Sequence, residues 1–567
     1  MDKVIKYLKS IPWHIWASIV IMLVGIFFRT YNFYDWMSFN TDGVRDSILV
    51  SHPIEEGIGS LPLLGPRAGG TQLHLGPIFY YFEYLAGAIF QSTNPVVFAF
   101  PTLLFSIITI PLFFLLLREY FSPKASLIMT AMFATCFMAI EYSRFAWNPN
   151  ATPFFTILFF LALLRAYNSE KKRILWFAVS GGSLAIATQL HFSAFLGLPI
   201  IFVLFTAINW KKTKEIFSWK SLLAFFGTIF VLYLPVFIFE FLTHGKNTKL
   251  FFDAIDTKGS SHTVFEKIIR DIGIFSKYFL WIIAGIVDGK KWQEVMSALL
   301  LFAGTGVNLF LIIKEIDEKK KRFLSLSFIF ILTFFVLYIP LAFDIKRSRF
   351  FLPVIIVPFM LTGYLIAFAR HMGFKQKGKL LIAIIIAVLI FGNVSLTLDW
   401  FSNMNMSQTG IKNSSFEKVS EKNKEFWWTW GRLEGAADYM KNNCNKKQVF
   451  FIISRKTGNF GDAIEYAFFM ARDGRNLIFK QKYKQEYEKY DSCYYYISLD
   501  RENLPDFLQQ KKYDSPSIMG DMKIVRWYPE IAGTAVFPPK KTSNRDDSLK
   551  NKIKSDYPRI LWRDLFR

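Results

Sequence analysis

Long apolar runs separated by short charged connections dominate residues 1–399 of the chain. A helix needs about 20 mainly apolar residues to cross the roughly 30 Å hydrocarbon layer of a bilayer. Eleven runs approach that length: 11–28, 95–117, 124–141, 151–166, 174–190, 194–209, 219–240, 294–313, 322–343, 350–369 and 378–398. The pattern therefore predicts a polytopic all-α membrane protein with about 11 transmembrane helices.

Two shorter aromatic stretches, at 77–91 and 273–287, do not fit this pattern. We expect helices that lie in the membrane interface or re-enter it, because counting either as a span would invert the orientation of every later helix. The first run follows MDKVIKYLK and resembles a signal peptide, but no small-residue cleavage site comes after it. It is therefore predicted to be a retained first helix.

The charged connections predict the orientation of the helices, because Lys and Arg stay on the cytoplasmic side of short loops. Alternate connections are basic, and we assign them to the cytoplasm: Lys3, Lys6 and Lys9; Arg118 and Lys124; Arg165, Lys171, Lys172 and Arg173; Lys211, Lys212 and Lys214; Lys314, Lys319, Lys320, Lys321 and Arg322; and Arg370, Lys375, Lys377 and Lys379. The predicted location is the plasma (inner) membrane, with a cytoplasmic N-terminus. The outer side receives the loops 29–94, 142–150, 191–193, 241–293 and 344–349, and everything after 400.

Residues 400–567 have the composition of a soluble domain and are predicted to form an extracytoplasmic α/β domain, separate from the transmembrane domain 1–399. Periodicity predicts helices near 433–442 and 462–472 and strands at 448–453 and 493–498. The last thirty residues are charged and are expected to form a loosely ordered tail. Two alternatives stay open for Cys444 and Cys493, a disulfide bridge or two free thiols. The motif FWWTW at 426–430 could bind sugar faces or form an interfacial aromatic belt.

The composition and the placement of charge indicate which class of partner the chain contacts. The chain of 567 residues is 52% hydrophobic and 18% aromatic, with a net charge of +23. The basic residues are spaced between apolar runs rather than gathered on one soluble face, which argues against a nucleic-acid partner and for membrane lipids. The three cysteines have no metal-ligand spacing such as a CxxC pair.

Polar residues gather at the predicted outer ends of the helices. Charged or hydrogen-bonding side chains beside membrane helices are costly and usually line a cavity or pair with one another. These are Asp42, Asp46, His74, Arg144, Asn148, Gln189, His191, Glu240, Arg347 and Arg349. Each alone could be an interfacial anchor or, for Asp42, a turn carboxylate. Their shared side predicts a polar pocket that opens outward.

The segment FNTDGVRDSILV places Asp42 at a turn that opens a short helix, with Arg45 and Asp46 within the next turn. This position would make Asp42 a general base, provided a substrate hydroxyl comes within hydrogen-bonding distance. Arginines would bind phosphate, because the guanidinium fork matches phosphate oxygens. The arginines predicted to bind the donor and its phosphate are Arg45, Arg144, Arg347 and Arg349.

A set of motifs in a fixed order resembles the multi-pass glycosyltransferases of the C-type fold (GT-C), particularly the protein O-mannosyltransferase and lipid A aminoarabinose transferase branch. The motifs are NTDGVRD, LLGPRAG, HLGPIFYYFEYLAG, EYSRFAWNPN, QLHFSAF, LPVFIFEF and RSRFFLPVIIVP. The resemblance covers roughly residues 10–400. It implies an inverting transferase that passes a sugar from a polyprenyl-phosphate carrier to an acceptor on the outer face. Lipid, glycan and protein acceptors all remain open.

The resemblance also implies roles for individual residues. Asp42 corresponds to the proposed base, and the second acid that often follows it in the family is replaced here by Gly43, so Asp46 is the candidate for that role. A divalent cation, Mg²⁺ or Mn²⁺, is an open alternative, because this group does not uniformly require one. The residues expected to line the substrate pocket are His74, Tyr80, Tyr81, Asn148, Gln189, His191 and Glu240.

Other classes fit the sequence less well. A transporter or flippase would place its polar residues near the bilayer midplane and show two related halves, and neither feature is visible. A membrane-anchored sensor would not need eleven spans. A polysaccharide ligase is the nearest alternative enzyme.

Overall fold

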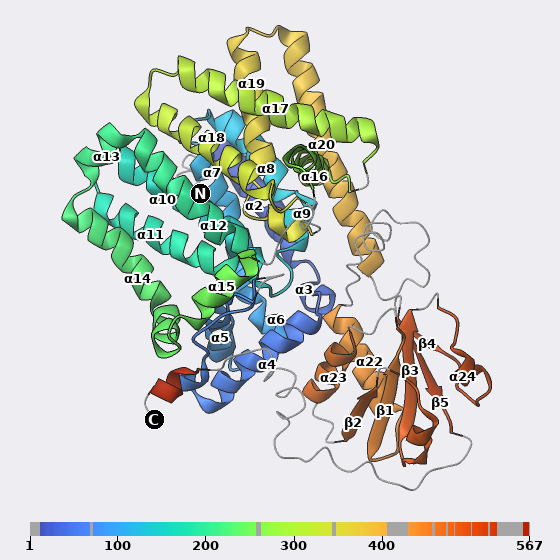
Figure 1. Ribbon diagram of the computed structural model, residues 1–567. Helices are drawn as coiled ribbons and strands as arrows, with labels where there is room; N and C mark the ends of the chain where they lie inside the picture. The colour runs from blue at the N-terminus through green and yellow to red at the C-terminus, as the bar shows by residue number, and fades with distance from the viewer. Residues whose placement is uncertain are drawn as a thin grey trace, which may run out of the picture.

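The computed structural model describes most of the chain: residues 12–68, 72–256, 262–287, 289–342, 347–404, 429–455, 460–471, 475–480, 482–499, 502–519, 522–529 and 560–565. Within these ranges a large helical bundle is followed by a five-stranded sheet with two helices on it (Figure 1). The predicted combination of a polytopic helical region and a C-terminal α/β region is confirmed.

The predicted apolar runs form the long helices of the bundle. These are α2 (Trp13–Thr30), α7 (Phe100–Leu117), α10 (Thr152–Asn168), α11 (Arg173–Leu190), α12 (Phe192–Ile208), α14 (Trp219–Leu242), α17 (Lys291–Lys314), α18 (Glu318–Tyr338), α19 (Val357–His371) and α20 (Gln376–Met404). Among the described residues, seven helices are long and apolar enough to cross a membrane, or eight if α12 and α13 (Trp210–Ile216), which meet at 95°, form one broken span. The finer figure of about 11 spans stays a prediction.

Some predicted runs differ from straight spans for local reasons. The run 124–141 is divided into α8 (Pro123–Ala134) and α9 (Phe137–Glu141). The run 350–369 begins with a short 3₁₀ helix, η3 (Ser348–Phe351), before α19. The stretch near 273–287 belongs to α16 (Val264–Ala284), which is longer than its apolar part, because Thr263 and Glu266 form a capping box that starts the helix within a polar segment.

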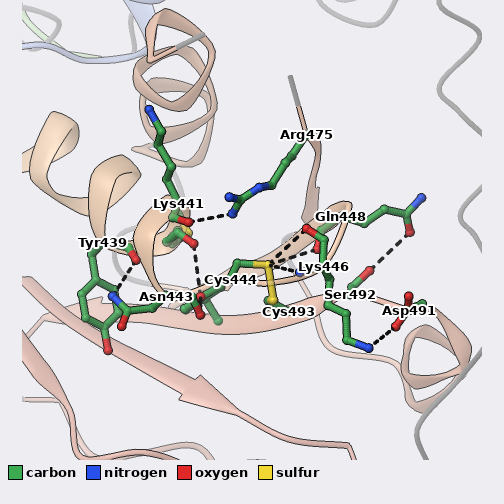
Figure 2. Close-up of a disulfide and its surroundings, with 12 residues drawn as sticks. Tyr439, Lys441, Asn443, Cys444, Lys446, Gln448, Arg475, Asp491, Ser492 and Cys493 are labelled. Atoms are coloured by element: carbon green, nitrogen blue, oxygen red, sulfur yellow. Dashed lines mark hydrogen bonds and ion pairs between the residues drawn. A yellow bond between two sulfur atoms is a disulfide. The ribbon is translucent and has the colours of Figure 1, made fainter. Parts of the chain in front are cut away.

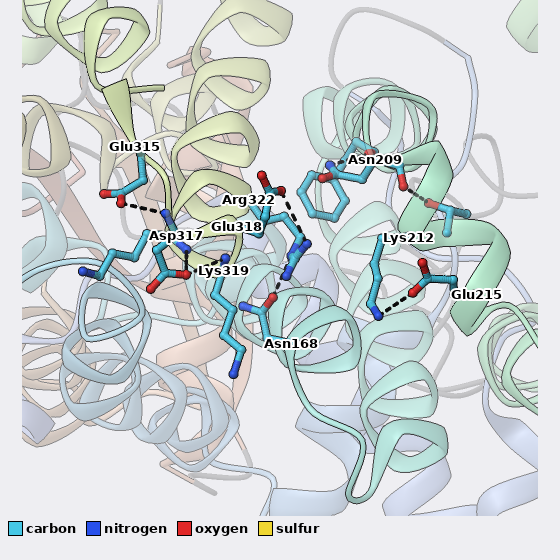
Figure 3. Close-up of polar contacts among 12 residues, drawn as sticks. Asn168, Asn209, Lys212, Glu215, Glu315, Asp317, Glu318, Lys319 and Arg322 are labelled. Carbon is cyan, nitrogen blue, oxygen red and sulfur yellow. Dashed lines mark hydrogen bonds and ion pairs between the residues drawn. The ribbon is translucent and has the colours of Figure 1, made fainter. Parts of the chain in front are cut away.

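Polar contacts join the basic connections to one another at one end of the bundle. Arg322 donates to Asn168 at 2.8 Å and lies 4.0 Å from Glu318 (Figure 3). Arg165 contacts Glu119 at 3.3 Å. These contacts link three connections that the sequence analysis assigned to the same side, as alternating helices require.

The segment between α2 and α7 carries several short helices. They are α3 (Phe33–Trp36), α4 (Thr41–Glu56), η1 (Ile58–Ser60), α5 (Ile78–Phe90) and α6 (Pro95–Phe98). Helix α4 starts at an Asn40 cap, with Asp42 in its first turn, and ends at Gly57, whose φ of 99° is readily adopted only by glycine. Helix α5 packs against α4.

The C-terminal region is a mixed sheet with strand order β2-β1-β3-β5-β4. Its strands are β1 (Gln448–Ile453), β2 (Asn476–Lys480), β3 (Cys493–Leu499), β4 (Ser517–Met519) and β5 (Met522–Trp527). Strand β1 pairs in parallel with β2 and β3, whereas β5 runs antiparallel to β3 and β4. Helices α22 (Trp430–Asn442) and α23 (Gly461–Met470) lie between the sheet and the bundle (Figure 1).

Three predicted features of this region lie at or beside undescribed residues. The expected domain boundary after 399 falls in the last turns of α20, which reaches Met404. Of the motif FWWTW, residues 426–428 lie outside the described residues, and Trp430 is fully buried. Of the expected tail, residues 538–559 and 566–567 lie outside the described residues, while 560–565 are ordered and contain η6 (Trp562–Leu565).

Cys444 and Cys493 form a disulfide, which settles the alternative left open by the sequence (Figure 2). Cys444 follows α22, and Cys493 is the first residue of β3. The bridge therefore ties α22 to the centre of the sheet. Cys136, the remaining cysteine, is buried in the bundle and free.

Replacing Cys444 and Cys493 together by serine should destabilise the C-terminal region by about 2–4 kcal/mol, because the bridge closes a long loop in the unfolded chain. Thermal unfolding of the protein in lipid discs, monitored by proteolysis of the sheet region, measures this change. The matched control is Cys136→Ser. An unfolding temperature equal to that of the wild type would show that the bridge does not stabilise the region.

Candidate active site

The N-terminus of α4 is fixed by its own residues. The Asn40 side chain accepts a hydrogen bond from the Gly43 backbone N–H at 3.1 Å. A Cβ atom at Gly43 would lie 2.9 Å from the Phe39 ring, closer than side chains approach. A side chain after Asp42 would therefore require the buried Phe39 ring to shift, which gives a physical reason for the missing second acid at this position.

Arg45 joins the two carboxylates of α4. Its guanidinium donates to both oxygens of Asp46, at 2.8 and 3.1 Å, and to Asp42 at 3.1 Å. The Asp42 side chain is 41% exposed, whereas that of Asp46 is 2% exposed. Asp42 thus presents an accessible carboxylate, and Asp46 holds the arginine that orients it. Arg45, predicted to bind the donor, is engaged with these two acids.

Helix α5 brings two further groups to this cluster. Tyr80 is fully buried and donates its hydroxyl to Asp46 at 3.1 Å. Glu83, one turn along α5, is 2% exposed, and its Oε2 atom has no hydrogen-bond partner among the residues that the structure describes. The sequence analysis did not single out Glu83, although a lone acid inside the apolar segment IFYYFEYLAG was the signal that could have identified it.

Asp46 and Glu83 share one buried environment, which disfavours two negative charges. Burial raises the pKa of Asp46, against the opposing effect of Arg45. Burial raises the pKa of Glu83 well above its usual range, and the nearby Asp46 charge raises it further. Because Arg45 and Tyr80 hydrogen-bond Asp46 while Glu83 Oε2 has no partner, we expect the proton to reside on Glu83.

A second polar group lies around Arg349, in η3. Its guanidinium lies over the Trp147 ring, 5.1 Å from the centroid. His191 caps α12 through Ser193, and its ring is 5.4 Å from that of Phe350. Burial, together with the Arg349 charge, lowers the pKa of His191 to about 3, so this imidazole is neutral. A neutral histidine leaves Arg349 as the cation of the group.

A small hollow is lined by residues that neighbour each of the two groups. Among its lining residues are Asn40, Gly43 and Ser47 of the α4 segment and Phe145 and Trp147 of the loop before α10. Trp147 also carries Arg349 on its ring. The tryptophan therefore connects the start of α4 with the arginine.

Arg144, which was predicted to bind phosphate, contacts backbone carbonyls. It is 1% exposed, and it donates to the backbone carbonyls of Phe28, Arg29, Tyr31 and Asn32 at 2.8–3.3 Å. Its guanidinium thus ties the last turn of α2 to the residues that follow it, and phosphate binding by Arg144 stays a prediction. Arg347, by contrast, is exposed at the start of η3.

The remaining predicted pocket residues make contacts within the fold. His74 bonds Gly65 and Asn247, Asn148 donates to Leu190, and Gln189 donates to Leu232 and lies against Gly76. Tyr81 donates to Pro62, and Glu240 accepts from Thr248. Of the predicted pocket residues, Tyr80 contacts the Asp42–Asp46 cluster and His191 lies near Arg349. The others contact different segments: His74, Tyr81, Gln189 and Glu240.

The residues present do not form a ready cation site. Within the described ranges, no three His, Cys, Asp or Glu side chains come together to hold a metal ion. Between Asp42 and Asp46, the Arg45 guanidinium already supplies the positive charge. A divalent cation at these two acids would have to displace it.

A family match covers part of the bundle. Residues 74–239 match the family described as dolichyl-phosphate-mannose-protein mannosyltransferase. This segment includes Tyr80, Glu83, Asn148 and His191, and it follows α4. The match confirms the resemblance predicted from the motifs and the enzyme class that it implied, a membrane glycosyltransferase. No curated protein sequence matches the chain significantly.

Solved structures with a similar arrangement are distant in sequence. The oligosaccharyltransferase of Archaeoglobus fulgidus, in complex with Zn and sulfate, is 14% identical with a TM-score of 0.47, covering 85% of this chain and 68% of that one. ArnT from Cupriavidus metallidurans, bound to undecaprenyl phosphate, is 10% identical with a TM-score of 0.48, covering 92% of this chain and 99% of that one. Likeness at this level assigns no role to a residue.

Glu83→Gln should make the protein less sensitive to alkaline pH. An acid whose pKa is raised on folding binds a proton in the folded state that the unfolded state has lost, so stability falls as pH rises from the usual carboxyl range through the raised pKa. The loss is about 1.4 kcal/mol per pH unit while Glu83 stays protonated.

Thermal unfolding between pH 5 and 9 measures this effect. In the variant, the slope of the free energy of unfolding against pH should be smaller by the contribution of one proton, while Asp46 continues to contribute. Glu55→Gln, an exposed acid on α4, is the control. A slope unchanged in Glu83→Gln would place the proton elsewhere.

Proposed function

We propose that this membrane glycosyltransferase transfers a sugar from a polyprenyl-phosphate donor to an acceptor hydroxyl on the outer face of the membrane, with inversion and with Asp42 as general base. The observation that carries the proposal is the accessible Asp42 carboxylate at the start of α4, fixed by Arg45 and the buried Asp46. The family match, whose description includes a dolichyl-phosphate-linked sugar, supports the class of donor.

In the proposed reaction, the acceptor hydroxyl lies between Asp42 and the anomeric carbon. Asp42 takes the hydroxyl proton as the new glycosidic bond forms, and the bond between the anomeric carbon and the carrier phosphate breaks on the opposite side. Arg45 holds the Asp42 carboxylate in one orientation, because its other N–H groups are fixed by Asp46. Precise placement of the base is worth a large part of the rate.

The leaving phosphate would be received by Arg349. A guanidinium stabilises the negative charge that grows on phosphate oxygens during departure, and this effect acts on the transition state. Arg349 is partly exposed and lies over the ring of Trp147, which lines the hollow, so it can meet a group that enters from the surface. Arg347, exposed two residues earlier, is a second candidate donor to the same phosphate.

The proposed orientation places the N-terminus in the cytoplasm and the sheet region outside. The carrier lipid would lie against the apolar helices, and the acceptor would approach from the side of α4 that faces the sheet region. The acceptor is a lipid, a glycan or a protein with a free hydroxyl. A panel of polyprenyl-phosphate sugars and host membrane extracts would identify both substrates.

Asp42→Asn should lower turnover at least a hundredfold while donor binding survives, because the amide keeps the shape of the side chain but cannot take the proton. The measurement is release of free polyprenyl phosphate by purified protein in lipid discs. Glu55→Gln, on the exposed face of the same helix, should retain activity. Near-normal turnover by Asp42→Asn would reject Asp42 as the base.

Arg349→Ala should weaken binding of polyprenyl phosphate about 10–100-fold, because it removes charge-assisted hydrogen bonds worth roughly 1.5–3 kcal/mol. Direct binding of the free carrier phosphate measures the loss. Arg349→Lys, which keeps the charge but not the fork, should have an intermediate effect, and Arg347→Ala serves as the comparison. Unchanged affinity in Arg349→Ala would make this arginine an interfacial anchor.

A further inference from the structure

Helix α4 is contacted at both ends by segments that follow the entire bundle in sequence. One is the start of α22 together with α23, and the other is residues 560–565, here called the C-terminal clip. Figure 1 shows α22 and α23 beside the first part of α4 and the red C-terminal segment beside its other end. Both carboxylates of the candidate site lie on the helix between these contacts.

The first contact fixes the residues that lead into α4. The Trp430 backbone N–H donates to the Met37 carbonyl at 2.7 Å, and Ser38 pairs with Thr429 in an isolated antiparallel bridge. The Trp430 indole packs edge-on against the Phe39 ring, with centroids 5.1 Å apart. Phe39 is the residue whose ring leaves no room for a side chain at Gly43.

The second contact fixes the other end of α4. Arg563 of the clip donates to Glu56, the last residue of α4, at 2.8 Å and to Ser60 at 3.0 Å. Two backbone hydrogen bonds accompany it, from Trp562 to Leu61 and from Leu63 to Ile560, each 3.2 Å long. The clip thus forms a short paired segment with the chain that leaves α4.

The clip also contacts α5. The Trp562 indole N–H donates to the Tyr81 hydroxyl at 2.9 Å. Tyr81 is adjacent in sequence to Tyr80, the residue that donates to Asp46. Two neighbouring clip residues, Trp562 and Arg563, therefore contact the two helices whose side chains meet at Asp46.

The exposure of the ion pair between the clip and α4 indicates a role in positioning rather than in stability. Glu56 and Arg563 are 44% and 43% exposed, and ion pairs at such exposure contribute little to folding. A displacement of about 1 Å at a catalytic group, by contrast, can lower a rate a hundredfold. Loss of the clip should therefore affect turnover much more than the folding of the bundle.

We propose that the C-terminal clip is a positioning element of the active site, which holds α4 and α5 together so that Tyr80 and Glu83 meet Asp46 and Arg45 orients Asp42. The inference rests on the proposed function for its effect on turnover. The structural part, that the clip orders α4 and α5, does not depend on which reaction the site performs.

The test uses an engineered disulfide in the full-length protein. A Cβ atom at Gly59 would lie 3.3 Å from the Arg563 Cβ atom, close to the separation found in disulfides. Gly59→Cys combined with Arg563→Cys should therefore form a bridge that keeps the clip on η1. We expect near-wild-type kcat when the bridge is oxidised and a 10–100-fold lower kcat after mild reduction, with KM for the donor changed less than threefold.

Wild-type protein treated with the same reductant is the control, because the reductant can also act on the native Cys444–Cys493 bridge. A second test inverts the ion pair: Arg563→Glu alone should lower kcat, and Arg563→Glu with Glu56→Arg should restore most of it. Thermal unfolding of both variants separates the two roles, because a merely structural role would lower the unfolding temperature in step with kcat. Equal kcat in the oxidised and reduced forms, or no recovery in the inverted pair, would overturn the proposal.

Hydrogen exchange distinguishes failure of the clip from failure of the proposed function. In the reduced double-cysteine protein, backbone exchange should rise at least fivefold in 41–56 and 78–90 and remain unchanged in the bundle helix 152–168. This result would support the clip even if no donor in the panel were consumed. Unchanged exchange in α4 and α5 would overturn it even if turnover by the wild type were strong.

Discussion

The arrangement of the candidate active site depends on one interaction, the Arg45 guanidinium held between Asp42 and Asp46. A buried carboxylate is costly unless a positive charge or hydrogen bonds compensate it, and Asp46 receives both, from Arg45 and Tyr80. Because Asp46 fixes two N–H groups of Arg45, the arginine can present a third to Asp42 in a defined direction. Without the buried Asp46 carboxylate, the exposed Asp42 carboxylate would lose its orientation.

Much of the fold followed from the sequence because a bilayer restricts it strongly. Apolar runs near 20 residues became helices, and the segment FNTDGVRDSILV predicted the short helix that opens around Asp42, which is α4. Local signals of this kind are complete within one turn. The α/β character of the sheet region was likewise readable, since β1 and β3 are continuous buried strands with few polar residues.

The side-chain roles were harder to predict, because they depend on partners that are distant in sequence. Arg144 at a helix end has the same local pattern whatever it contacts, so its hydrogen bonds to residues 28–32, over a hundred residues away, could not be predicted from that pattern. Glu83 was overlooked because its importance comes from Asp46, on another helix. The Gly43 departure from the family pattern became understandable only once the position of the Phe39 ring was known.

The separation of Glu56 from Arg563 by 507 residues has a consequence for biosynthesis. At about 5–20 residues per second, the ribosome makes the clip roughly 25–100 s after α4. Every candidate span after α2 is synthesised in that interval, so the bundle can insert and pack while the α4 segment still lacks its distal contact. A nascent chain would thus pass through membrane insertion with an incomplete site, and the order of synthesis itself would delay the onset of activity until the helices are in place.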